Sequence, residues 1–334
     1  MRVAVIGVGS MGQAHARVYS GLPGAQLVAV CDLDEKRRLE VAEKHSVEAV
    51  EDYRDLEGKV DAVSIAVPTV AHAETASFFL ERGVSAIVEK PMALNSTQAA
   101  ALVEAADTSG ATLMVGHIER FNPAFMAMRE HSLHPLFIEC DRISPFKFRS
   151  ADVGVVFDLM IHDIDIILSL AQSPLERVDA CGVSVIGEPE DICNARFVFE
   201  NGCVANVTAS RVSTKSMRKI RLFSRDAYIT VDYAGRQAMI YRKSPKLTVD
   251  AAQELKRGAT SLADFAGMAF PELLDIQDVE LDDHEPLAKE LEAFIGAIES
   301  GCAPPVTGRD GLEAVAVAEK VLASVEEHKR RLDA

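Results

Sequence analysis

The sequence lacks several patterns that would place the protein in a specialised class. Its six cysteines occur without CxxC or CxxH spacing, which argues against a zinc site and against a disulfide framework. No apolar run reaches membrane-spanning length, and the chain enters a strand pattern at once, without the features of a signal peptide. Internal repeats and low-complexity tracts are also missing. We therefore expect a cytoplasmic globular protein, and 334 residues suffice for two domains.

An excess of positive charge is missing as well. The formal net charge is −16 at pH 7, which disfavours nucleic acid and anionic membranes as partners. A small anionic ligand remains compatible, because a local patch can oppose the global charge. Two segments, 142–149 and 211–225, are basic. Cations near a cleft suit phosphate or carboxylate, but we interpret the second segment as a solvated strand face or a subunit contact.

The N-terminal stretch carries a glycine motif in a strand–turn–helix setting. Arg2–Ile6 reads as a strand, GVGSMG follows with glycines at 7, 9 and 12, and Met11–Tyr19 reads as a helix. In this setting the first glycine makes the turn, the second admits a pyrophosphate and the third lets helix pack on strand. Free N–H groups at the start of the helix then bind the phosphates. The motif predicts a dinucleotide site.

Asp32 indicates which dinucleotide is bound. A second strand, Gln26–Val30, ends just before it, about 20 residues after the glycines, where an acidic side chain accepts from the ribose 2′-hydroxyl. Its charge would repel a 2′-phosphate, so the sequence favours NAD over NADP. Arg37 and Arg38 are a counter-signal, and we interpret them as solvated residues of the next helix.

The alternation of strands and helices continues to about residue 118. We expect strands at 62–66, 86–88 and 112–116, with helices at 71–82 and 97–107, which together form a doubly wound, mostly parallel sheet. Ligands of such sheets bind beyond the carboxyl ends of the strands. Lys90 follows one of these ends and should point into the cofactor crevice. We interpret His72, at the start of a helix, as a cap or packing residue rather than a catalyst.

After the stretch 119–129 the pattern changes to successive strands. We expect them at 136–142, 179–186, 193–200, 203–211, 218–223, 227–232 and 237–242, with Asn201-Gly202 as a hairpin turn. Ala195, Phe197 and Phe199 should share the face that covers helices. Strands without intervening helices indicate a separate α+β domain with a mostly antiparallel sheet. We place the domains at 1–118 and 119–334, do not assign 244–284, and expect helices at 287–298 and 311–328, the last packing back on the first domain.

The stretch Val155–Leu170 is an apolar helix that carries ionisable residues. At about 100° per residue, Asp158, His162, Asp165 and Ser169 fall on one stripe, whereas Asp163 points elsewhere. Burying such groups is costly unless they are paired or face a wet cleft. The stripe therefore indicates the wall of a site. The alternative is a helix end with solvated aspartates and one satisfied core histidine.

With these residues established, the chain resembles the Gfo/Idh/MocA oxidoreductase family along nearly its whole length. The matching motifs are GVGSMG, the PTVAH of 68–72, the EKP of 89–91, the DLMIHDID of 158–165 and the closing PVTGRDGLEA. The resemblance implies NAD-dependent oxidation of a sugar or cyclitol hydroxyl, and assembly as dimers or tetramers through the outer sheet face. It also implies that Lys90 contacts both nicotinamide and substrate, that His162 is the general base or acid, and that Asp158 assists one turn earlier.

A finer resemblance concerns VGHIERFNPAF at 115–125 together with DLMIHDIDIILSL. These motifs are similar to those of bacterial and archaeal UDP-N-acetylglucosamine 3-dehydrogenases. His117 and Glu119 are the residues that favour this group over the rest of the family. The candidate cofactor-binding residues are Gly7, Gly9, Ser10, Met11, Gly12, Asp32, Pro68, Thr69, His72, Glu89 and Lys90. The candidate substrate-binding residues are His117, Arg120, Lys147, Arg149, Asp158 and His162.

Three functions remain open on the sequence. They are a UDP-N-acetylglucosamine 3-dehydrogenase, an inositol or free-sugar dehydrogenase, and a non-catalytic NAD-binding sensor. The presence of Lys90, Asp158 and His162 disfavours the sensor. One detail of the site is also open, because Asp158 and Asp165 both lie within one turn of His162 and either could orient it.

Overall fold

A parallel sheet of six strands forms the first part of the protein, confirming the expected doubly wound fold. The computed structural model describes residues 1–129, 131, 134–146, 153–244 and 274–332. The strand order is β3-β2-β1-β4-β5-β6, and every neighbouring pair is parallel. The strands are β1 (Arg2–Ile6), β2 (Gln26–Cys31), β3 (Glu48–Val50), β4 (Ala62–Ile65), β5 (Ser85–Glu89) and β6 (Leu113–Gly116). The order reverses between β1 and β4, where ligands of this fold bind.

Helices connect the six strands and cover the sheet. They are α1 (Ser10–Tyr19), α2 (Glu35–His45), α3 (His72–Leu80) and α4 (Ser96–Ser109), with short 3₁₀ turns η1 (Tyr53–Leu56), η2 (Thr69–Ala71) and η3 (Ile118–Phe121). Two helices from the end of the chain, α9 (Pro286–Ser300) and α10 (Gly308–Leu332), return to this part. Helix α9 packs against α1 and η3.

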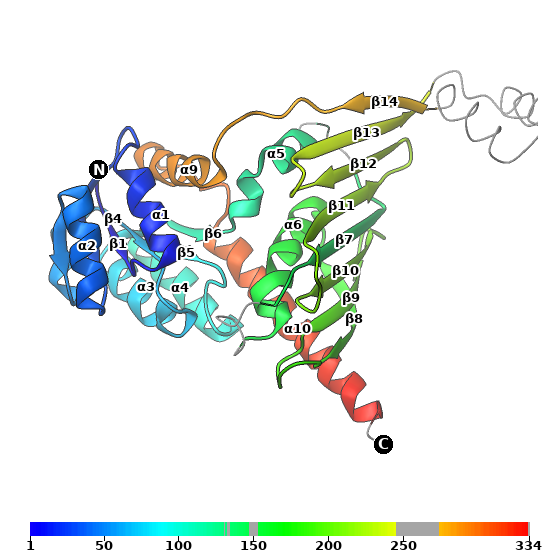
Figure 1. Ribbon diagram of the computed structural model, residues 1–334, viewed down its shortest axis with the longest axis horizontal. Helices are drawn as coiled ribbons and strands as arrows, with labels where there is room; N and C mark the ends of the chain where they lie inside the picture. The colour runs from blue at the N-terminus through cyan, green and yellow to red at the C-terminus, as the bar shows by residue number, and fades with distance from the viewer. Residues whose placement is uncertain (130, 132–133, 147–152, 245–273, 333–334) are drawn as a thin grey trace, which may run out of the picture. The chain divides into compact units, whose positions relative to one another are not determined.

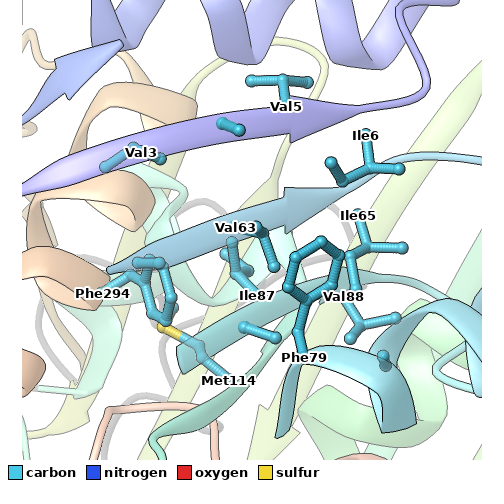
Figure 2. Close-up of a cluster of buried hydrophobic side chains, with 14 of the residues drawn as sticks. Val3, Val5, Ile6, Val63, Ile65, Phe79, Ile87, Val88, Met114 and Phe294 are labelled. Atoms are coloured by element: carbon cyan, nitrogen blue, oxygen red, sulfur yellow. The ribbon is translucent and has the colours of Figure 1, made fainter. Parts of the chain in front are cut away.

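The core of this unit comes from strands that are buried on both faces. Ile6 of β1 lies beside Ile65 of β4, and the buried cluster also contains Val3 and Val5 of β1, Val63 of β4, Phe79 of α3 and Phe294 of α9 (Figure 2). These side chains are at most 2% exposed. Continuous Val and Ile runs are typical of parallel strands covered on both sides, and they place the strand ends at a defined edge of the sheet.

The beginning of α10 completes the packing around β6. Met114 of β6 forms a bridge with Thr307, and the N–H of Val115 donates to the carbonyl of Val306. Gly308 and Gly311 lie so close to Leu113 and Val115 that a Cβ at either glycine would be within 2.6 Å of a side-chain carbon. The beginning of α10 therefore lies against β6 of the six-stranded sheet.

An eight-stranded sheet forms the second part, again as expected. Its order is β14-β13-β12-β11-β7-β10-β9-β8, with β7 and β10 parallel and the other pairs antiparallel. Helix α5 (Pro123–Arg129) packs against β12 and β13 (Figure 1). The strands are β7 (Phe137–Ile143), β8 (Leu175–Val183), β9 (Ile192–Phe199), β10 (Val204–Ser210), β11 (Met217–Phe223), β12 (Ala227–Asp232), β13 (Gln237–Lys243) and β14 (Leu274–Asp278).

Most expected strands of this sheet are confirmed within a residue or two, but β8 is displaced. We expected it at 179–186, and it spans Leu175–Val183. Beyond its end the N–H groups of Val185 and Ile186 donate to Oδ2 of Asp191 at 2.7 and 2.6 Å. This buried carboxylate binds the backbone as a loop, so two apolar residues that resemble a strand are exposed instead.

Two strands were not predicted, whereas the hairpin and the covered face were. Strand β3 has three residues, and β14 is a largely exposed edge strand of five residues. The Asn201-Gly202 turn joins β9 to β10, with Gly202 at φ 84°. Ala195, Phe197 and Phe199 are at most 1% exposed. No helix in the described part of the chain is long and apolar enough to cross a membrane.

The contacts divide the chain into two compact units. The first contains residues 1–122, 156–166 and 284–326, and the second contains 123–155, 167–283 and 327–334. The division therefore falls inside helix α6 (Ile161–Ala171). As a result, the conspicuous polar residues of that helix belong to the same unit as the glycine motif.

Candidate active site

The glycine motif has the geometry that a dinucleotide turn requires. Gly7 has φ 85°, and a Cβ there would lie 2.7 Å from the carbonyl oxygen of Ala66. A Cβ at Gly12 would lie 1.8 Å from the carbonyl oxygen of Gly7, whereas one at Gly9 would meet only an arginine nitrogen at 3.9 Å. The first and third glycines are thus demanded by turn and packing, and the second leaves open space beside the start of α1. Exposed Ser10 and Met11 occupy that first turn.

Asp32 is held in place beside this turn. Its Oδ2 accepts from the N–H of Val8 at 2.8 Å, and its Oδ1 accepts from the N–H of Asp34 at 2.9 Å. The carboxylate therefore has a fixed orientation at the end of β2, next to the open space at Gly9. This position suits recognition of an adenosine ribose through its hydroxyl groups.

The two arginines after Asp32 differ, and our interpretation of Arg38 as solvated was wrong. Arg38 is 8% exposed and donates to the carbonyl oxygen of Asp32 at 2.7 Å, so it is part of the loop structure. Arg37 is half-exposed: it donates to Asp34 at 2.9 Å and lies 3.6 Å from Oδ2 of Asp32. One cation therefore does stand at the ribose position, balanced by two carboxylates.

His72 ties together the loops that follow β4 and β5. Its Nε2 lies 2.9 Å from the carbonyl oxygen of Val67, and its Nδ1 lies 2.9 Å from that of Pro91. The ring is 1% exposed, and burial lowers the pKa of His72 although both carbonyl contacts oppose this effect. Because its nitrogens are committed to backbone oxygens, His72 shapes the loop around Pro68 and Thr69 as a packing residue.

Lys90 and Asp158 are in direct contact. The Nζ of Lys90 donates to the backbone carbonyl of Asp158 at 2.7 Å and lies 3.7 Å from Oδ1 of the same residue. The two side chains are 20% and 29% exposed. A lysine at the end of a buried strand thus meets a partner 68 positions away in the sequence, and both retain access to solvent.

The helix that carries Asp158 and His162 does not begin as an α-helix. Residues Val156–Met160 form a π-helical turn, and α6 follows from Ile161. The uniform spacing of about 100° per residue that we assumed is therefore wrong for the first turn, which contains Asp158. Half-buried His162 lies in the next turn. Local π turns are frequent at functional sites, because the wider turn changes the direction of individual side chains.

Asp165 and Arg120 form a buried ion pair. Nε and Nη2 of Arg120 donate to the two oxygens of Asp165 at 2.6 and 2.8 Å, and the side chains are 7% and 1% exposed. Asp310 of α10 lies 3.8 Å from the same guanidinium. The charge of Asp165 is therefore balanced by Arg120. Of the two carboxylates considered for His162, Asp158 is the one that contacts Lys90.

His117 is enclosed directly after β6. It is 1% exposed, and both ring nitrogens are buried without a hydrogen-bond partner among the described residues. Burial lowers the pKa of its imidazole, partly opposed by the charge of Asp165. The ring is thus a neutral group beneath the surface. The other expected substrate contacts, Lys147 and Arg149, lie outside the described residues.

Sequence reasoning missed two buried ionisable residues near this site. His15 of α1 is 1% exposed and bonds to Glu89, and Glu290 of α9 is completely buried. Both interrupt apolar helix faces, since Glu290 follows Leu287 by three residues and precedes Phe294 by four. This is the same signal that drew attention to Asp158 and His162. It could have identified Glu290 in advance.

The arrangement has the parts needed for hydride transfer from a hydroxyl group. A dinucleotide turn with Asp32, the cation Lys90, the carboxylate Asp158 and the titratable His162 all belong to one compact unit. A base near neutral pH and a cation for developing alkoxide charge are what the oxidation of an alcohol requires.

Comparison with known proteins agrees with this chemistry. Residues 1–117 match the model of the GFO/IDH/MocA oxidoreductase family with its NAD-binding Rossmann fold, and residues 127–230 match the C-terminal domain of that family. The UDP-N-acetylglucosamine 3-dehydrogenase of Acidithiobacillus ferrooxidans is 34% identical over 332 residues, which cover 99% of each chain. The inositol 2-dehydrogenase of Rhizobium meliloti is 27% identical over 350 residues, covering 99% of this chain and 98% of the relative.

Solved structures show the same fold. The structure of the Acidithiobacillus ferrooxidans UDP-N-acetylglucosamine 3-dehydrogenase has a TM-score of 0.86 at 33% identity, covering 98% of both chains. A levoglucosan dehydrogenase in complex with NADH has a TM-score of 0.83 at 19% identity, covering 98% of this chain and 97% of the other. The second likeness concerns the fold alone.

Proposed function

Because the chain belongs to the GFO/IDH/MocA family of NAD-binding oxidoreductases, we propose that it oxidises the 3-hydroxyl of UDP-N-acetylglucosamine to the 3-keto nucleotide sugar. Membership of this family establishes that the protein is an NAD-dependent dehydrogenase that acts on CH–OH groups. The observation that supports this particular substrate is the 34% identity to a UDP-N-acetylglucosamine 3-dehydrogenase, which extends over 99% of both chains. The motif around His117 and Glu119 supports it as well.

The residues of the site have distinct roles in this reaction. Bound NAD supplies the acceptor for the hydride that leaves the carbinol carbon. His162 takes the hydroxyl proton, since an imidazole can act as a base near neutral pH. Lys90 stabilises the alkoxide charge that develops on the same oxygen, and Asp158 orients Lys90 through the contacts at 2.7 and 3.7 Å.

The cofactor is held by the glycine turn and by the strand ends. The N–H groups at the start of α1 bind the pyrophosphate, with Ser10 and Met11 in the first turn. Asp32 binds the ribose, and Pro68 and Thr69 line the path from β4 towards Lys90. Glu89 is the last residue of β5, and its contact with His15 supports the end of this strand.

For the substrate we propose contacts with both the sugar and the diphosphate. Lys90, Asp158 and His162 bind the reacting hydroxyl, and Lys147 and Arg149 supply cations for the diphosphate. His117 and Arg120 define the floor of the sugar site. They act from below it, because His117 is enclosed and Arg120 is bonded to Asp165.

We also propose that the protein is a homodimer or homotetramer that assembles through the outer face of the eight-stranded sheet. A row of half-buried rings crosses this face on four neighbouring strands. The ring centroids of Phe137 and Phe223 are 5.8 Å apart, those of Phe223 and Tyr228 4.7 Å, and those of Tyr228 and Tyr241 5.0 Å. Light scattering after gel filtration tests the proposal, and a monomer at micromolar concentration would contradict it.

Two alternatives compete with this function. An inositol or free-sugar dehydrogenase would use the same residues, and several inositol dehydrogenases are similar over nearly the whole chain at 26–27% identity. A non-catalytic NAD-binding sensor would need no catalytic group. The direct contact between Lys90 and Asp158 disfavours the sensor, because it joins two of the candidate catalytic residues in one solvent-accessible place.

An assay with a panel of substrates separates the three functions. The protein is incubated with NAD and, in turn, UDP-N-acetylglucosamine, UDP-glucose, free N-acetylglucosamine and myo-inositol, while the absorbance of reduced nicotinamide is followed. We expect the highest kcat/KM with UDP-N-acetylglucosamine, by at least about a hundredfold over myo-inositol. Preference for myo-inositol or a free sugar would establish the first alternative. NAD binding in calorimetry without reduction by any compound would favour the sensor.

A further inference from the structure

Glu290 is an unusual residue because its carboxyl group is buried without a partner. The side chain is 0% exposed, and both oxygens lack a hydrogen-bond partner among the described residues. An ionised carboxylate in such a place is very costly, so the group either loses its charge or finds a donor. The protonation state of Glu290 therefore depends on which donors or acceptors lie close to it.

Only one of the two ring nitrogens of His15 has a hydrogen-bond partner, and this shows which nitrogen carries the hydrogen. Its Nε2 lies 3.0 Å from Oε1 of Glu89, and its buried Nδ1 has no partner among the described residues. The carboxylate of Glu89 can only accept, so Nε2 carries the hydrogen. In a neutral imidazole Nδ1 is then an acceptor that needs a donor.

Glu290 and His15 lie on two helices that pack against each other. Helix α9 packs against α1, and Tyr19 lies one turn after His15 on the same helix face. Burial raises the pKa of Tyr19, whose hydroxyl lies 2.9 Å from Oγ of Ser64. The unsatisfied acid of α9 and the unsatisfied nitrogen of α1 therefore belong to two adjacent helices, and both residues interact with Glu89.

The charges around Glu290 also favour its neutral form. Burial raises the pKa of Glu290 well above its usual value, and the charges of Glu89 and Asp165 add to the effect. The nearby cation Arg120 is already bonded to both oxygens of Asp165. A protonated Glu290 becomes a donor, which is what Nδ1 of His15 lacks. The charged groups that act on it are Glu89 on β5 and Asp165 on α6, and the titratable residues His15 and Tyr19 lie on the adjacent helix α1.

We propose that Glu290 is a neutral carboxylic acid whose O–H donates to Nδ1 of His15 through one buried water molecule. This link completes a hydrogen-bonded series of three residues, Glu290, His15 and Glu89. This hydrogen-bonded series carries two protons and one negative charge, which resides on Glu89.

This hydrogen-bonded series acts on the candidate active site through the end of β5. Glu89 immediately precedes Lys90, and its carboxylate lies against Gly116, where a Cβ would be 3.0 Å from Oε1. His15 holds this carboxylate from α1, and Glu290 holds His15. Glu290 is thus a positioning residue for Lys90, and only this consequence rests on the proposed function.

Spectroscopy tests the protonation without any substrate. Infrared spectra at pH 7 should contain the C=O stretch of a protonated carboxylic acid that disappears in Glu290→Gln and persists in Glu292→Gln, a control on the exposed side of α9. Nitrogen NMR of His15 should show hydrogen on Nε2 and none on Nδ1. The proposal is overturned if the acid band does not depend on Glu290, or if His15 is doubly protonated.

Kinetics test the positioning role with a pair of variants. Glu290→Gln retains a donor for Nδ1 of His15, whereas Glu290→Met has a similar volume and no donor. We expect Met to lower kcat about tenfold with little change in KM, as for a small misplacement of a catalytic group, and Gln to recover most of that loss. Equal kcat values in the Met variant and the native protein would overturn the role of Glu290 in positioning Lys90, while the spectroscopic result would stand if the substrate proposal failed.

Discussion

Single side chains at the carboxyl edge of the six-stranded sheet form the candidate site. Lys90 reaches the backbone carbonyl of Asp158, and Asp32 is bonded to the turn that precedes α1. Each contact joins residues distant in sequence, so the site depends on the closure of the fold. Individual substitutions should therefore separate catalysis from cofactor choice.

The catalytic assignment predicts large losses from two substitutions. His162→Ala removes the base, and Lys90→Ala removes the cation beside the developing alkoxide. Each should lower kcat at least about a hundredfold, measured as the initial rate of nicotinamide reduction. Lys36→Ala, which removes an equal charge from an exposed position of α2, serves as the control. Near-native rates in both variants would refute the assignment.

The geometry around Asp32 predicts how cofactor preference can change. Asp32→Asn removes the repulsion of a 2′-phosphate and leaves Arg37 close by, formerly 3.6 Å from the carboxylate. Calorimetric titration with both nucleotides should show affinity shifting towards NADP by about tenfold or more, or about 1.4 kcal/mol. Adding Arg37→Ala should cancel this shift, whereas adding Lys36→Ala should not. If the native protein binds NADP more tightly than NAD, the role of Asp32 is wrong.

At the scale of elements, the helix that carries His162 is anchored by its neighbours. The Arg120–Asp165 pair joins η3, which follows β6, to the part of α6 that lies one turn beyond His162. The π turn before α6 places Asp158 next to Lys90. Buried ion pairs of this kind do little for net stability, but their loss leaves an uncompensated charge in the interior.

This anchoring predicts a large effect on stability. Arg120→Ala leaves Asp165 buried without its cation and should lower the free energy of unfolding by about 3–5 kcal/mol, measured by urea denaturation. The double variant Arg120→Met, Asp165→Leu should lose less than the single one, because no charge remains buried. Arg309→Ala breaks the exposed pair with Asp107 and should cost less than about 1 kcal/mol. Equal losses in the Arg120 and Arg309 variants would show that the buried pair has no special role.

At the scale of the whole molecule, the buried acid Glu290 should influence stability across the pH range. The pKa of Glu290 is raised by burial well above the usual 4.5. Above pH 4.5 the unfolded chain has released this proton while the folded protein retains it, so the free energy of unfolding falls as pH rises towards the folded-state pKa. The contribution is fully present only below the unfolded-state pKa.

Thermal unfolding as a function of pH measures this dependence. Glu290→Gln should remove part of the decline in Tm above about pH 5, so that its advantage over the native protein grows with pH. Glu292→Gln, exposed on the same helix, should follow the native curve. Parallel curves for the native protein and the Glu290 variant would contradict a raised pKa in the folded state.

The order of elements and the cofactor turn were predictable because they depend on local patterns. Alternating apolar strands, the spacing of Gly7, Gly9 and Gly12, and the hairpin at Asn201-Gly202 act over a few residues, and the structure confirms them. The displaced strand β8, the π turn at Val156–Met160 and burial of Arg38 were not predicted. Each depends on a partner distant in sequence or on a hydrogen-bond pattern with no spacing of its own.

The sequence by itself determined that the chain binds a dinucleotide, and it predicted which residues assist the oxidation of a hydroxyl group by that cofactor. Glycine spacing and ionisable residues on an apolar helix are local signals of chemistry, since they would be costly without a function. Only the tertiary structure decided how those residues pair: Lys90 with Asp158, Asp165 with Arg120 and Glu89 with His15. A carboxylate is recognisable in the sequence, but its charge and its partner depend on burial and on which donors the fold brings within about 3 Å.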